Sequence, residues 1–110
     1  MFWNKPKNKY EAEIRKRYYK SGALYSETPY VDGKVHGITK DYYESGALEE
    51  EIPYVNGEKH GIAKWYYKSG ALRGEAPYKD GKIHGILKIY RESGALERET
   101  PYKNGRCTGY

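Results

Sequence analysis

Aromatic, aliphatic and turn-forming residues return in the same order every 24 residues along the chain. Ser-Gly-Ala-Leu begins at positions 21, 45, 69 and 93, Pro-Tyr begins at positions 29, 53, 77 and 101, and Asp-Gly or Asn-Gly ends at positions 33, 57, 81 and 105. A fixed period of this size indicates one supersecondary unit that stacks on copies of itself.

Each unit reads as two strands separated by two tight turns. Asn56-Gly57 is a strong hairpin signal, because a type I′ turn needs positive φ at both central residues, and Ser45-Gly46 is a weaker form of it. The runs between these turns are rich in Tyr, Ile, Leu and Thr, as strands are. The sequence therefore predicts an all-β protein: one extended, twisted antiparallel meander of consecutive hairpins, with four 24-residue repeats.

Strand pairing follows if both loops are two-residue turns. The predicted partners are Glu44 with Ala47, Tyr43 with Leu48, Lys40 with Glu51, Tyr54 with Lys59, Glu51 with Ile62, and Leu48 with Trp65. Lys then faces Glu in every copy, a favourable cross-strand pair of roughly 0.2–1 kcal/mol. A three-residue loop with a bulge would shift this register and lose the match, so two-residue turns are favoured.

This register predicts two different faces of the sheet. One face carries Gly61, Ala63, Trp65, Tyr67, Leu72, Ala76 and Tyr78 with their equivalents, and the other carries Ile62, Lys64, Tyr66, Glu75, Pro77 and His84. The first is mostly apolar or small, and the second mixes aromatic, charged and proline side chains.

The composition fits one domain built as a single sheet. The 110 residues include fourteen Tyr, two Trp and one Phe, and Tyr buries a large ring while its hydroxyl stays in water. The repeat domain is predicted over residues 13–110, since residues 13–20 keep the repeat register. Residues 1–12, with Phe2 and Trp3, are expected either to cap the first strand or to form a flexible basic arm.

Several classes of protein are not expected. Cys107 is the only cysteine, which excludes a disulfide framework and a cysteine-based metal site. No apolar run approaches the roughly 20 residues of a membrane span, and the first residues lack the apolar region of a secretory signal. A cytoplasmic location is the expectation.

The net charge of +5 lies entirely in the first twenty residues. The basic residues there are Lys5, Lys7, Lys9, Arg15, Lys16, Arg17 and Lys20, against Glu11 and Glu13. The body of the chain is neutral, so only the N-terminal segment is predicted to attract polyanions.

The repeat resembles a known family. The residues that carry the resemblance are His-Gly at His60 and His84, the motif Tyr-Tyr-x-Ser-Gly-x-Leu from Tyr66 to Leu72, and Tyr-x-x-Gly from Tyr78. Over residues 13–110 they are similar to the MORN-type repeat, in the variant form of bacterial YwqK-like antitoxins. The resemblance implies consecutive hairpins in one long sheet, and a chain that binds and neutralises a partner protein.

The sequence contains only weak signals for a metal-binding or catalytic site. His36, His60 and His84 lie two strands apart, about 9.6 Å, whereas ligands of one zinc ion must come within about 4 Å of each other. Each His is expected to pack beside a turn. Glu49, Glu50 and Glu51 alternate between faces and are expected to be solvated. The sequence thus predicts no catalytic residue, no metal site, no cofactor and no enzyme.

Two binding functions remain open. The first is a protein-binding module, acting on a toxin or nuclease, whose contacts are Tyr43, Leu48, Tyr54, Trp65, Tyr67, Tyr78 and Ile89, since Tyr offers contact area at low entropy cost. The alternative is single-stranded nucleic acid held by Tyr and Trp stacking and by Lys5, Lys7, Lys9, Arg15 and Arg17. Self-association through the open sheet edges is a further expectation.

Overall fold

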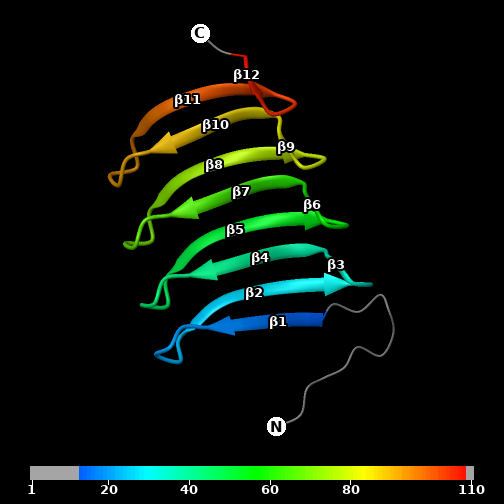
Figure 1. Ribbon diagram of the computed structural model, residues 1–110. Coiled ribbons are helices and arrows are strands. Elements are labelled where there is room, and N and C mark those ends of the chain that lie inside the picture. The colour runs from blue at the N-terminus through cyan, green and yellow to red at the C-terminus, as the bar shows by residue number, and fades with distance from the viewer. Residues whose placement is uncertain (1–12, 109–110) are drawn as a thin grey trace.

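A computed structural model describes residues 13–108, and every strand in that range belongs to one antiparallel sheet (Figure 1). The long strands are β1 (Glu13–Tyr18), β2 (Leu24–Val31), β4 (Gly37–Tyr42), β5 (Leu48–Val55), β7 (Gly61–Tyr66), β8 (Leu72–Lys79), β10 (Gly85–Tyr90) and β11 (Leu96–Lys103). The short strands are β3 (Lys34–Val35), β6 (Glu58–Lys59), β9 (Lys82–Ile83) and β12 (Arg106–Cys107). The predicted sheet of consecutive hairpins is confirmed, while the cap or arm predicted for residues 1–12 lies outside the described residues.

The sheet is a single layer with almost no enclosed interior. Its Cα extents are 53 × 32 × 17 Å and its radius of gyration is 16.1 Å, against about 13 Å for a compact domain of 100 residues. The most enclosed apolar side chains are those of Ala63 and Ala76, which are 3% and 1% exposed. Stability must therefore come from contacts between neighbouring copies, as in other repeat proteins.

The Ser-Gly loops have three residues, so the prediction of two-residue turns there is wrong. Tyr43 N–H donates to Ala47 O at 2.8 Å, and Gly46 N–H donates to Tyr43 O at 2.9 Å. Gly46 has φ +98°, the conformation that closes such a loop at little steric cost for glycine. The loop therefore spans Glu44, Ser45 and Gly46, and Glu44 does not face Ala47.

A bulge next to this loop restores the predicted register. Tyr42, rather than Tyr43, lies opposite Leu48, and the register then shifts between Asp41 and Tyr42. The two displacements cancel, so that Lys40 faces Glu51 as predicted. A bulge places one extra residue on one strand, and here it moves the leucine to the face opposite to the predicted one.

The Asn-Gly turns are two-residue turns, as predicted. Asn56 and Gly57 have φ of +48° and +87°, and Tyr54 faces Lys59. Gly57 N–H donates to Val35 O at 2.8 Å in the preceding copy. Hydrogen bonds therefore link successive turns at one end of the long strands, where β3, β6, β9 and β12 lie (Figure 1).

A second irregularity follows each of these turns. His60 N–H donates to Pro53 O at 3.0 Å, and Gly61 has φ +116°. Pro53 has no N–H to donate to the neighbouring strand β7. For the same reason, proline within sheets is confined to edge strands and bulges. The register consequently moves by two residues, and Glu51 faces Lys64 while Glu50 faces Trp65. The predicted pairs of Glu51 with Ile62 and of Leu48 with Trp65 are wrong.

The paired tyrosines join each copy to the next. Tyr19, Tyr43 and Tyr67 donate their hydroxyls to the backbone oxygens of Tyr42, Tyr66 and Tyr90, at 2.6, 2.6 and 2.7 Å. Tyr42, Tyr66 and Tyr90 in turn donate to Glu27, Glu51 and Glu75, at 2.7, 2.7 and 3.2 Å. The Tyr-Tyr pair thus stabilises the contact between neighbouring copies wherever it occurs.

Because these hydrogen bonds need protonated tyrosine hydroxyls, we expect the free energy of unfolding to fall at high pH. Partial burial and the hydrogen bond to Glu51 raise the pKa of Tyr66 to about 12, and the hydrogen bond to Glu27 and burial raise that of Tyr42 to about 12. Because these folded-state values exceed the unfolded value of 10.0, the stabilisation is present below pH 10 and is lost as pH rises toward 12.

The measurement is chemical denaturation at a series of pH values, together with the ultraviolet absorbance of tyrosinate. Tyr66→Phe is the matched variant, because it should be less stable at neutral pH and should lose less stability between pH 10 and pH 12. Tyrosines that all titrate together near pH 10 in the folded protein would contradict the prediction.

Candidate partner-binding faces

The register defines two faces, because residues directly opposite each other in a sheet share one face. We call the first the tyrosine face; it carries Tyr30, Tyr54, Tyr78 and Tyr102, with Trp65 and Ile89. We call the second the isoleucine face; it carries Ile14, Ile38, Ile62 and Ile86, opposite Pro29, Pro53, Pro77 and Pro101.

The predicted contact residues fall into three groups. Tyr54, Trp65, Tyr78 and Ile89 lie on the tyrosine face. Leu48 lies on the isoleucine face with Tyr42, and Leu72 pairs likewise with Tyr66. Tyr43 and Tyr67 directly follow β4 and β7, where their hydroxyls hold the next copy. The structure therefore brings four of the seven residues onto one surface.

Trp65 stands in a hollow at the centre of the tyrosine face. The hollow has a volume of about 260 Å³ and is lined by Glu50, Ile52, Lys59, Ala63, Trp65 and Tyr78. The indole packs on Gly74, which lies opposite it in β8; an added Cβ at Gly74 would come within 2.7 Å of the ring. The absence of a side chain at Gly74 therefore makes the space that the Trp65 ring occupies.

Two carboxylates lie beside this hollow. Asp41 is directly opposite Glu50, and Glu50 is directly opposite Trp65. Partial burial raises the pKa of both carboxyl groups, and the charge of Asp41 raises that of Glu50 further. The equivalent pairs in the other copies are Arg17 with Ser26, Trp65 with Gly74, and Ile89 with Arg98, so this copy alone sets two acids against each other.

The isoleucine face presents a regular apolar stripe that the sequence analysis did not single out. Its four isoleucines are between 46% and 52% exposed, and shallow hollows of about 400 and 260 Å³ lie beside Ile14 with Ile38 and beside Ile62 with Ile86. The signal was present in the sequence, because isoleucine follows Glu13 or a glycine at the same position in each repeat.

The row of lysines and glutamates on the isoleucine face is not a row of contact ion pairs. Among residues 13–108, ion pairs within 4.0 Å join Arg15 to Glu13 and Arg91 to Glu97. His60 Nδ1 lies 3.9 Å from Asp80 Oδ1, but this nitrogen accepts a backbone hydrogen bond and carries no proton to pair with the carboxylate. The glutamates opposite the lysines instead accept hydrogen bonds from tyrosine hydroxyls, as described above.

The three histidines pack beside turns, as predicted. His36 Nδ1 accepts a hydrogen bond from Asn56 N–H at 3.2 Å, His60 Nδ1 from Asp80 N–H at 3.4 Å, and His84 Nδ1 from Asn104 N–H at 3.3 Å. In the described part of the chain, no three His, Cys, Asp or Glu side chains are grouped as metal ligands would be. Each histidine thus stabilises the turn of the following copy through this hydrogen bond.

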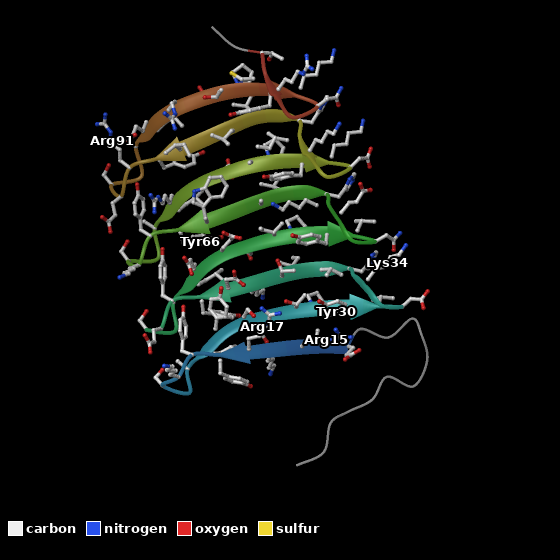
Figure 2. The ribbon with its side chains drawn as sticks, in the orientation of Figure 1. Arg15, Arg17, Tyr30, Lys34, Tyr66 and Arg91 are labelled. Atoms are coloured by element: carbon white, nitrogen blue, oxygen red, sulfur yellow. The ribbon has the colours of Figure 1, made fainter. Side chains whose placement is uncertain are left out.

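The predicted nucleic-acid contacts are only partly described. Lys5, Lys7 and Lys9 lie outside the described residues. Arg15 and Arg17 are both on β1 (Figure 2). Arg15 pairs with Glu13 at 3.1 Å and stacks over the Tyr30 ring at 4.0 Å, whereas Arg17 lies opposite Ser26. Nucleic-acid binding stays a prediction.

Within residues 13–108 there is no helix long and apolar enough to cross a membrane.

Comparison with protein families gives one result that covers most of the chain. The family model of the MORN repeat variant matches residues 14–32, 35–56, 59–80 and 83–104. The chain belongs to this family. Each MORN match covers one hairpin, namely β1–β2, β4–β5, β7–β8 or β10–β11. Searches of curated proteins and of solved structures gave no match. MORN repeats are generally modules that bind proteins or membranes.

Proposed function

We propose that this MORN repeat chain is a non-enzymatic module that binds a partner protein through its tyrosine face. The observation that carries the proposal is the hollow in which Trp65 lies on Gly74, between Glu50 and Tyr78. A few residues carry most of the binding energy at protein interfaces, and tryptophan and tyrosine are enriched among them. Two of the predicted contacts, Trp65 and Tyr78, line this hollow.

The specific role that we propose is inhibition, in the manner of an antitoxin that neutralises a toxin or nuclease in the cytoplasm. Hydrogen bonds between copies support it, because they preorganise the surface. Tyrosine hydroxyls and turn amides link each hairpin to the next. A preorganised surface loses little conformational entropy on binding and can hold a partner tightly enough to block it.

The test is co-purification with the tagged full chain from the cell of origin. We expect one protein to be retained at a fixed ratio, in a complex whose mass is measured by light scattering, and to lose its own activity on binding. Retention of single-stranded nucleic acid instead, weakening steeply as salt is raised, would reject the proposal. Failure to retain any protein at a fixed ratio would also count against it.

A further inference from the structure

Repulsion between the two carboxylates beside Trp65 destabilises this part of the tyrosine face. Like charges directly opposite each other in a sheet are destabilising, and Asp41 and Glu50 are both partly buried. Within the described residues, neither carboxylate has a lysine or arginine nitrogen within 4.0 Å. The charge of Arg17 only partly offsets the rise in the pKa of Asp41, and that of Lys59 only partly offsets the rise in the pKa of Glu50. A bound cation would relieve this repulsion.

The walls of the hollow are also suited to a cation. Trp65 and Tyr78 contribute aromatic rings, and Ile52 and Ala63 contribute apolar surface. Glu50 and Lys59 complete the lining with one charge of each sign. The chain itself shows the interaction, since Lys59 Nζ lies 5.0 Å from the centroid of the Tyr78 ring. An aromatic ring attracts a cation over its face, most strongly where water is excluded. The hollow therefore combines aromatic walls with two carboxylates, that of Glu50 in the lining and that of Asp41 opposite it, against the one ammonium group of Lys59.

Among the side chains of a partner protein, arginine fits these features best. A guanidinium group is planar, stacks on aromatic rings, and donates two parallel hydrogen bonds to carboxylates. We propose that the hollow beside Asp41, Glu50 and Trp65 receives an arginine side chain from a basic, extended segment of the partner protein. This inference rests on the proposed function and adds the chemistry of what is bound.

A metal ion is the other cation to consider. Two neighbouring carboxylates supply too few ligands for calcium, which takes six to eight oxygens. The described residues offer no third acidic or histidine side chain grouped with them. The aromatic walls would not contribute ligands, whereas they would stack on a guanidinium group.

The experiment is a nuclear magnetic resonance titration of the full chain with three short peptides. The peptides have one central arginine, citrulline or lysine between glycine and serine residues; citrulline keeps the shape of arginine without its charge. We expect the arginine peptide to shift the Trp65 indole N–H and the backbone amides of Asp41 and Glu50. The citrulline peptide should bind about tenfold more weakly or worse, since hydrogen bonds to charged groups are the strong ones.

Matched variants locate the effect. Glu50→Gln should weaken binding of the arginine peptide by about tenfold, whereas Glu99→Gln, the same change on the isoleucine face of the outer strand β11, should leave it unchanged. Unchanged amide spectra away from the site would show that both variants fold. Equal binding of arginine and citrulline peptides, or equal binding to Glu50→Gln and the original chain, would overturn the inference.

The titration also separates this inference from the proposed function. If a partner protein is captured through Trp65 while the arginine peptide produces no shifts, the proposed function stands and the arginine inference fails. If the peptide binds as expected while no partner protein is captured, the hollow is a cation site and the proposed function fails. Shifts produced by calcium chloride alone, and abolished in Glu50→Gln, would assign the acids to a metal and overturn the inference.

Discussion

Replacing Trp65 by alanine is expected to weaken binding of the partner protein by roughly 30- to 1000-fold, or about 2–4 kcal/mol. The indole is a large aromatic group at the centre of the tyrosine face, and it packs against Gly74. Its truncation removes contact area, and it also removes a wall of the hollow beside Glu50. The affinity is measured by calorimetry with the purified partner.

The fold should survive this change, because other copies place quite different side chains at the same position. Arg17, Asp41 and Ile89 are the equivalents of Trp65 in β1, β4 and β10. Trp65→Ile, which reproduces the fourth copy, is therefore a conservative second variant that should also lose affinity. Ile62→Ser is the control on the opposite face. Loss of affinity in Ile62→Ser but not in Trp65→Ala would assign binding to the isoleucine face instead.

Replacing Gly85 by alanine is expected to lower the free energy of unfolding by about 3 kcal/mol. Gly85 has φ +128°, a conformation that costs other residues roughly 1–3 kcal/mol. An added Cβ would also lie 2.7 Å from Pro77 Cγ, and overpacking of this kind typically costs about 1–3 kcal/mol. Proteins have only about 5–15 kcal/mol of stability, so the effect should be plain in urea denaturation.

Gly94→Ala separates the two contributions to that loss. Gly94 also has a positive φ, of +96°, but an added Cβ there would meet no atom within 4 Å. It should therefore show the backbone strain without the contact with proline, and lose about 1–2 kcal/mol. Equal losses in the two variants would mean that the contact between Gly85 and Pro77 contributes nothing.

The sequence by itself determined the architecture. The 24-residue period and the Asn56-Gly57 turn predicted consecutive hairpins, because the requirement for positive φ is local and is met by few residues. The opposition of Lys40 to Glu51 was also predicted, although for an incomplete reason: a three-residue loop and a bulge displace the register in opposite senses. The prediction that the histidines pack beside turns rested on elimination, because their strand spacing excludes a shared zinc ion.

Only the tertiary structure decided which side chains meet on each face. Bulges moved Leu48 to the isoleucine face and brought Glu50 opposite Trp65, and the bulge beside the Ser-Gly loop has no distinctive residue to reveal it in the sequence. The hollow likewise depends on cross-strand neighbours, Trp65 with Gly74 and Asp41 with Glu50, which lie nine residues apart within each hairpin. Local sequence sets the turns, whereas register sets the surface, since a shift of one residue exchanges the two faces of a strand.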